Sequence, residues 1–245
     1  MKKRKAPRFD LLTIFPGMFD SYLNESMIKR ARARNLLDIR VHDLRDWAVS
    51  KHRQVDDRLF GGGPGMLLKV EPIYRALKSL KALPPLVTPS GAKRSRGAHS
   101  SKKRPYVVLM SPAGTRFDQR VAERLAKHGR ILLICGRYEG VDHRVNEHLI
   151  DEAISVGDYV LTGGELPAMV VLDAVSRLVP GVVGKAESVA NESHSKPGYL
   201  EHPQYTRPEV FSPVKGRKWA VPEILLSGDH KKVAAWREKH SKRRP

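Results

Sequence analysis

The stretch VGDYVLTGGELPAM, Val156 to Met169, decides the fold of this 245-residue chain. Its two adjacent glycines, Gly163 and Gly164, allow the backbone to approach a neighbouring group closely. Asp158 and Glu165 flank them, and no lysine follows. An apolar run leads into the stretch and an apolar helical pattern follows it. We therefore expect a connection between a strand and a helix that holds a ligand other than a phosphate.

Two other apolar runs end in comparable loops. YVVLM, Tyr106 to Met110, runs into SPAG, and RILLI, Arg130 to Ile134, runs into CGRYEG. Helical patterns follow both loops. For the first of these helices, Asp118 is the expected N-cap and Gly129 the expected stop. Alternating strands and helices predict an α/β fold with a parallel sheet covered by helices. Ligands bind beyond the carboxyl ends of such strands, so the three loops are predicted to line one pocket.

The composition of these loops limits the ligand. They contain neither of the glycine-rich phosphate patterns, and the carboxylates of Glu139, Asp158 and Glu165 would repel a pyrophosphate. Carboxylates and main-chain amides suit a ligand with a cationic centre and a flat ring, and S-adenosylmethionine has both. The alternative is that the glycines only form tight turns. GGGPG, Gly61 to Gly65, also lacks a phosphate-binding lysine and reads as a mobile loop over a site or a plain turn.

Elsewhere the patterns are ordinary. Strands are expected over 8–15 and 36–44 with one helix over 18–35 between them, and a helix is expected over 71–83.

The chain is strongly basic. Its 45 Lys and Arg residues exceed the 26 Asp and Glu residues, giving a net charge of +19. Such an excess favours nucleic acid as a partner, with a basic solubility surface as the alternative.

One cysteine, Cys135, excludes an intramolecular disulfide and a cysteine metal cluster, which fits a reducing cytoplasm. No apolar run approaches the roughly 20 residues of a membrane span. We expect no metal site from histidine and acid spacing. The segment 83–105 is basic and lacks aromatic residues, so it is predicted to be a disordered insertion.

Five motifs together resemble one family. They are DDRLFGGGPGM, CGRYEGVD, SVGDYVLTGGELPAM, PGVVGK and PQYTRPEVF, in this order between Asp56 and Phe211. They are similar to the motifs of the TrmD-type bacterial tRNA (guanine-N1)-methyltransferases, and the resemblance covers nearly the whole chain. It implies a fold of the SPOUT class, in which a parallel sheet carries a C-terminal trefoil knot. It also implies a homodimer with active sites at the subunit interface.

The resemblance implies a domain organisation and a site. An S-adenosylmethionine-binding domain is expected over 1–185, a flexible linker over 186–198 and a small helical tRNA-binding domain over 199–245. The expected methyl-donor pocket consists of Leu109, Met110, Pro112, Gly136, Tyr138, Glu139, Val156, Gly157, Asp158, Tyr159, Val160, Leu161, Gly163, Gly164 and Pro167. The expected tRNA contacts are His52, Asp56, Lys215, Arg217 and Lys218. A Mg²⁺ requirement is reported for the family, but no motif marks a site for it.

The implied reaction moves a methyl group from S-adenosylmethionine to N1 of guanine 37 of tRNA, 3′ of the anticodon. A carboxylate can remove the N1 proton, and an arginine can stabilise charge on O6. The family's aspartate base aligns with Glu192, which is a departure from the family pattern, and Glu187 is a weaker candidate. The arginine is Arg177, although a solvated helix residue is its ordinary interpretation. Two alternatives stay open: a non-enzymatic RNA-binding protein, and a SPOUT methyltransferase acting on another RNA.

Overall fold

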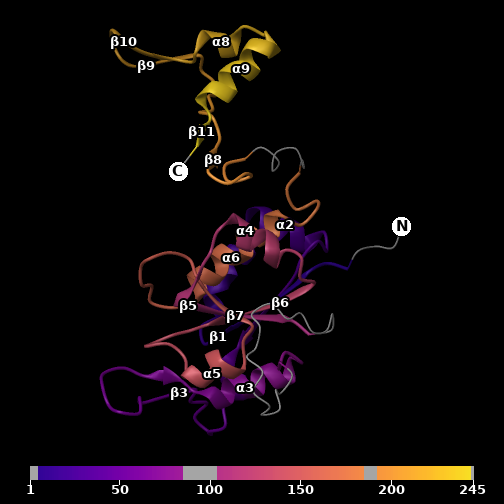
Figure 1. Cartoon of the computed structure of the whole chain (residues 1–245), viewed down its shortest axis with the longest axis vertical. Helices are drawn as coiled ribbons and strands as arrows, with labels where there is room; N and C mark the ends of the chain where they lie inside the picture. Colours follow the sequence, from indigo (N-terminus) through magenta and orange to yellow (C-terminus); the bar gives the residue numbers. More distant parts are fainter. Residues whose placement is uncertain (1–4, 85–103, 185–191, 244–245) are drawn as a thin grey trace. The chain divides into compact units, whose positions relative to one another are not determined.

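The computed structural model describes residues 5–84, 104–184 and 192–243. The chain divides into two compact units, Met1–Gly184 (unit 1) and Lys185–Pro245 (unit 2), and each is described by itself (Figure 1). Most of the predicted insertion 83–105 lies outside the described residues. The same holds for Glu187 and for residues 186–191 of the predicted linker.

Unit 1 is built on a five-stranded sheet in which every neighbouring pair is parallel. The strand order is β2-β1-β6-β5-β7, and the bounds are β1 (Arg8–Thr13), β2 (Asp38–Asp43), β5 (Tyr106–Arg116), β6 (Arg130–Cys135) and β7 (Glu152–Ser155). The predicted parallel sheet is therefore confirmed. β7 is shorter than the apolar run that predicted it, because the chain leaves the sheet after Ser155.

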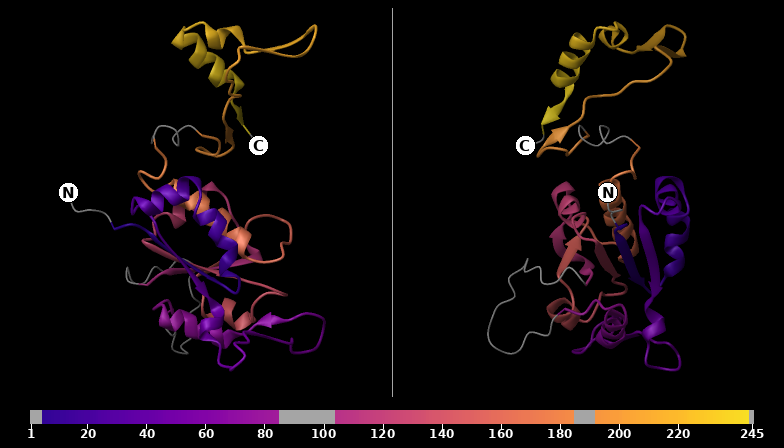
Figure 2. Two further views of the ribbon diagram at one scale, coloured as in Figure 1. Left: turned by 180° about the vertical axis from the view of Figure 1, so that it is seen from behind. Right: turned by 90° about the vertical axis from the view of Figure 1, so that its right-hand side faces the viewer.

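Helices cover both faces of this sheet (Figures 1 and 2). One face carries α2 (Ser26–Ala33), α4 (Gln119–Leu125) and α6 (Glu165–Arg177), and the other carries α3 (Val70–Ser79) and α5 (His143–His148). Side chains alternate along a strand, so β1 serves both layers. Phe9 and Leu11 pack in the first core, whereas Leu12 belongs to the second.

Local sequence accounts for the helix boundaries. The Asp118 side chain accepts a hydrogen bond from the Val121 N–H at 2.8 Å, which confirms the predicted N-cap, but α4 ends at Leu125 before Gly129. The single helix expected over 18–35 is wrong. It is three short pieces, η1 (Pro16–Phe19), α1 (Asp20–Leu23) and α2, because the polar run at 24–26 favours turns and caps. The remaining elements of unit 1 are η2 (Leu44–Trp47), β3 (Asp56–Asp57) and β4 (Leu67–Leu68).

Unit 2 is not purely helical. Its elements are β8 (Tyr199–Leu200), β9 (Val210–Val214), β10 (Arg217–Ala220), α8 (Glu223–Leu226), α9 (His230–His240) and β11 (Lys242–Arg243). The helical expectation missed the antiparallel hairpin of β9 and β10, which turns at Gly216 with a φ of 84°. Trp236 of α9 stacks on His240 with ring centroids 4.0 Å apart. None of the helices in the described part of the chain has the length and apolar character of a membrane span.

Candidate functional site

A cavity of about 520 Å³ lies in unit 1 at the carboxyl ends of β6 and β7 and beside the irregular part of β5 after Met110. The middle of β5 and the loops that follow β6 and β7 supply most of its walls, and α5 adds His143 and Asn146. This volume falls within the range of small-molecule sites. The sheet topology explains the position, since all five strands are parallel and their carboxyl ends share one edge.

Thirteen of the fifteen predicted pocket residues line this cavity, namely Leu109, Met110, Pro112, Gly136, Tyr138, Glu139, Val156, Tyr159, Val160, Leu161, Gly163, Gly164 and Pro167. Gly157 and Asp158 do not line it. Sequence reasoning missed Ser111, Ala113, Arg137, Gly140, Val141, His143, Asn146, Ile154 and Ser155. Most of these are immediate chain neighbours of predicted residues. The two residues on α5 carried no signal, because no glycine or motif of the predicted loops points to them.

β5 is irregular after Met110, so the predicted SPAG loop is an interruption within this strand and not a loop after it. Ile154 of β7 pairs first with Met110 and again with Thr115, so residues 111–114 form an excursion between the two pairings. A Cβ atom on Gly114 would lie 2.4 Å from the Ile154 nitrogen, so only glycine fits there. The excursion carries Ser111, Pro112 and Ala113 into the cavity wall.

The glycine pair allows two backbones to touch. The Gly164 N–H donates to the Gly136 carbonyl oxygen at 2.8 Å. A Cβ atom on Gly164 would lie 2.7 Å from the Cα of Cys135. Burial, followed by the nearby Glu165 charge, raises the pKa of the Cys135 thiol, which is therefore unreactive. The glycines thus hold the 156–164 segment against the end of β6.

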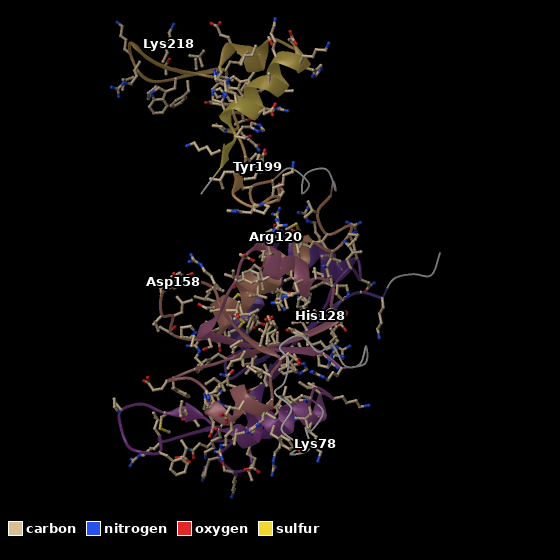
Figure 3. The ribbon with its side chains drawn as sticks, viewed as in Figure 1. Lys78, Arg120, His128, Asp158, Tyr199 and Lys218 are labelled. Atoms are coloured by element: carbon tan, nitrogen blue, oxygen red, sulfur yellow. The ribbon has the colours of Figure 1, made fainter. Side chains whose placement is uncertain are left out.

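Two of the three carboxylates expected to face the ligand do not. Glu165 is fully buried, and its oxygens accept from Thr13 Oγ1 at 2.6 Å and from Arg137 Nε at 2.8 Å. Asp158 is exposed at the rim, 3.1 Å from Arg116 (Figure 3). The local sequence did not predict these ion pairs, because the arginine partners of Glu165 and Asp158 lie 28 and 42 residues away along the chain. Only Glu139 lines the cavity.

The GGGPG loop ends against the cavity wall. A Cβ atom on Gly65 would lie 2.5 Å from Cγ of Glu139, so the carboxylate side chain rests on this glycine. The next residues run beside the CGRYEG loop: the Glu139 N–H donates to Met66 O, and the Leu68 N–H donates to Gly140 O. The loop therefore fixes where Glu139 lies.

The other predicted site residues are spread over the chain. Asp56 pairs with Leu68, the residue that hydrogen-bonds Gly140, while His52 is exposed. Arg177 is partly buried and ends α6, about 18 Å along the helix axis from Glu165 at 1.5 Å per residue. Arg177 does not line the cavity.

The remaining predicted residues, Glu192, Lys215, Arg217 and Lys218, belong to unit 2. Within the described residues, no group of three or more His, Cys, Asp or Glu side chains is arranged to hold a metal ion.

A five-stranded parallel sheet with a ligand-sized cavity at its carboxyl edge defines an α/β protein that binds a small molecule at its strand ends. The family model described as tRNA (Guanine-1)-methyltransferase TrmD matches residues 7–245. The chain therefore belongs to this family of S-adenosylmethionine-dependent tRNA (guanine-N1)-methyltransferases.

Individual relatives agree with this assignment. The tRNA (guanine-N(1)-)-methyltransferase of Dehalococcoides mccartyi strain BAV1 is 50% identical over 237 residues, which cover 97% of this chain and 86% of the relative. That of Thermomicrobium roseum is 50% identical over 94% of this chain and 77% of its own. The crystal structure of the tRNA (m1G37) methyltransferase from Aquifex aeolicus matches with a TM-score of 0.71 and 37% identity, over 96% of this chain and 89% of that one.

Proposed function

We propose that this chain holds S-adenosylmethionine in the cavity of unit 1 and directs its methyl group to N1 of guanine 37 in tRNA. One observation carries the proposal. In a chain of this family, the irregular part of β5 and the loops after the neighbouring parallel strands β6 and β7 meet around one cavity of suitable volume.

The cavity lining fits the chemistry of this methyl donor. Leu109, Leu161 and Pro167 provide apolar surface for a flat ring. Glu139 is an anionic side chain in the same wall, which suits a cationic sulfonium. The close contact of Gly164 with Gly136 brings main-chain groups to the rim of the cavity. When bound, S-adenosylmethionine supplies an electrophilic methyl group.

The chain's own task is to prepare the guanine. N1 of guanine carries a proton and becomes a good nucleophile only when a base removes it. We assign this step to Glu192. Negative charge then builds on O6, where the guanidinium of Arg177 would stabilise it.

Glu192→Gln tests the assignment of the base. Its single-turnover rate should fall by about two to four orders of magnitude while tRNA and methyl-donor binding persist. A near-normal rate in this variant would remove Glu192 from the mechanism.

The place of Arg177 argues for a homodimer. It lies at the far end of α6, about 15 Å along the helix axis from Pro167, the residue of this helix that lines the cavity. An arginine side chain is too short to span this length, so Arg177 would act at the cavity of a second copy of the chain. Exposed apolar side chains on α6, Leu166 and Val170, supply surface for such a contact.

Unit 2 would bind the tRNA. Every residue of its β9–β10 hairpin is exposed, with Lys215 at the turn and Arg217 and Lys218 on β10. Figure 3 shows Lys218 on this hairpin. Phe211 and Trp219 face each other across the hairpin with ring centroids 5.7 Å apart. Cations suit phosphates, and exposed aromatic rings suit unpaired bases.

We also infer the trefoil knot. β7 lies beyond β5 at the edge of the sheet, whereas Gly164 packs against the end of β6 on the other side of β5. The 156–164 segment must therefore cross the end of β5. A knotted connection requires such a crossing, and the excursion at residues 111–114 provides a loop for it.

Two further assignments remain proposals. Cytoplasmic localisation follows from the proposed tRNA substrate. A Mg²⁺ requirement can be tested by assaying methyl transfer with and without a chelator, with Ca²⁺ as a comparison.

The decisive experiment is to incubate the protein with S-adenosylmethionine and total tRNA, digest the RNA, and search for 1-methylguanosine by mass spectrometry. Its appearance at position 37 would support the proposal. A protein that binds tRNA without forming the product would be the non-enzymatic alternative. Methylation of ribosomal RNA or of a ribose would identify a different SPOUT substrate.

A further inference from the structure

A buried hydrogen-bonded group lies behind the cavity wall. Glu165, the first residue of α6, accepts from Thr13 Oγ1 at 2.6 Å and from Arg137 Nε at 2.8 Å. Glu165 and Thr13 are almost completely buried, and the Arg137 side chain is 14% exposed. The group joins the end of β1, the loop after β6 and the start of α6. We call these three residues the Thr13–Glu165–Arg137 group.

Arg137 extends this group to the cavity surface. Its Nη1 donates to the Thr162 carbonyl oxygen at 3.2 Å, and its guanidinium lies 4.7 Å from the centre of the Phe15 ring. A Cβ atom on Gly163 would lie 2.2 Å from Arg137 Nε, so the arginine passes directly over this glycine. Arg137 and Gly163 both line the cavity, whereas Glu165 and Thr13 do not.

We propose that Glu165 is a positioning residue for methyl-donor binding, acting through Arg137 to hold the CGRYEG loop against the 156–164 loop. This inference rests on the proposed use of the cavity. Each carboxylate oxygen serves one donor, so a single side chain fixes β1 and the arginine together. A neutral side chain of the same shape would leave the partly buried guanidinium without this counter-charge.

The location of Glu165 favours a carboxylate. It occupies the first turn of α6, where the helix dipole stabilises negative charge. In Glu165→Gln, the amide oxygen can still accept from Arg137, but the amide nitrogen then faces Thr13 Oγ1. That oxygen already accepts from the Phe15 N–H at 2.9 Å. The substitution therefore removes the charge and disturbs the Thr13 contact with almost no change in volume.

Asp10 offers a matched control. It is also a fully buried carboxylate of unit 1, hydrogen-bonded to Arg8, His42 and Arg130. It lies near the amino end of β1 and does not line the cavity. Asp10→Asn should destabilise the fold through the same kind of loss without touching the proposed function of Glu165.

The test is calorimetric titration of the full chain with S-adenosylmethionine, with thermal unfolding of each variant measured alongside. Glu165→Gln should raise the Kd of the methyl donor by about tenfold or more, the factor that corresponds to one lost charge-assisted hydrogen bond. Asp10→Asn should lower the unfolding temperature but keep the Kd within about twofold, as expected for a distant site.

The outcomes separate the two levels of inference. A wild-type chain that does not bind S-adenosylmethionine overturns the proposed use of the cavity and this inference with it. A wild type that binds, together with a Glu165→Gln variant of unchanged Kd, overturns the positioning role alone. The same holds if Glu165→Gln and Asp10→Asn weaken binding equally.

Thr13 provides a second route if Glu165→Gln does not fold. Thr13→Val keeps the shape and removes the hydroxyl that holds Glu165, so it should raise the Kd. Thr13→Ser keeps the hydroxyl and should restore the wild-type value. Equal Kd values for these two variants would contradict the proposal, because the hydroxyl that donates to Glu165 would then have no effect of its own on binding. A Kd raised in Thr13→Ser alone would contradict it as well, because the lost methyl group would then be the cause.

Discussion

The main-chain N–H of Gly164 donates to the carbonyl oxygen of Gly136 at 2.8 Å, so two cavity loops meet backbone to backbone. Gly164→Ala should break this contact, because the new Cβ would lie 2.7 Å from the Cα of Cys135. We expect a loss of about 1–3 kcal/mol in the free energy of unfolding, as in other overpacked cores. Methyl-donor binding should weaken as well, measured by urea unfolding and calorimetry.

Gly129→Ala is the control for this substitution. A Cβ atom there meets nothing within 4 Å, so its stability and methyl-donor affinity should match those of the wild type. If the two alanine variants behave alike, the close approach at Gly164 does not limit the fold.

How much the sequence could predict depends on the distance between interacting residues. Three apolar runs followed by glycine loops predicted the parallel sheet and most of the cavity lining, because each signal is local. The burial of Glu165 was not predictable, since Thr13 and Arg137 lie 152 and 28 residues away along the chain. The hairpin could have been found, because Gly216 marks a turn between a short apolar segment that holds Val210 and Phe211 and a second one that holds Trp219.

Asp10 should make the stability of unit 1 depend on acid pH. Burial alone would raise its pKa, but hydrogen bonds from His42, Arg8 and Arg130 outweigh burial and hold the pKa far below its ordinary value of 3.8. A depressed folded-state pKa adds stability that is fully present above the unfolded value and is lost as the pH falls toward the folded one.

Asp10→Asn should therefore cost about 3 kcal/mol between pH 5 and pH 7, the usual effect of breaking a buried ion pair. The difference from the wild type should narrow below pH 4, measured by urea unfolding across this range. Asp38→Asn removes an exposed carboxylate that pairs with Arg40, so it should cost less than about 1 kcal/mol. If the difference in unfolding free energy between the wild type and Asp10→Asn stays constant down to pH 2, the ionised form of Asp10 is not its cause.

The β9–β10 hairpin should contribute phosphate contacts to tRNA. Replacing Lys215, Arg217 and Lys218 together with alanine should weaken tRNA binding and reduce its salt dependence. The slope of log K against log salt should fall by up to about 0.9 for each lost contact. The measurement is a filter-binding series over several salt concentrations.

The control for this triple hairpin variant removes the same charge from unit 1. Lys78, Lys81 and Lys127 are exposed, and their triple alanine variant changes the net charge by the same amount. If both triple variants reduce the slope equally, the hairpin contributes only to the overall charge and is not a local tRNA contact.

Arg177 should act on the cavity of the partner subunit, since it lies about 18 Å along α6 from the helix start beside its own cavity. Two variants, each inactive alone, test this. Arg177→Ala removes the guanidinium but keeps the cavity, and Leu161→Arg blocks the cavity but keeps Arg177. In a mixed dimer, one active site would combine the intact cavity of the first subunit with the intact arginine of the second.

Random re-association of equal amounts should then restore about one quarter of the wild-type methyl-transfer rate, because half of the dimers would be mixed and each would hold one complete site. Calorimetry should first establish that Arg177→Ala binds S-adenosylmethionine and that Leu161→Arg does not. Native mass spectrometry should verify that mixed dimers form. If they form and no activity returns, Arg177 serves its own subunit, and the shared active site is excluded. An Arg177→Ala variant that is active alone would show that Arg177 has no part in the reaction.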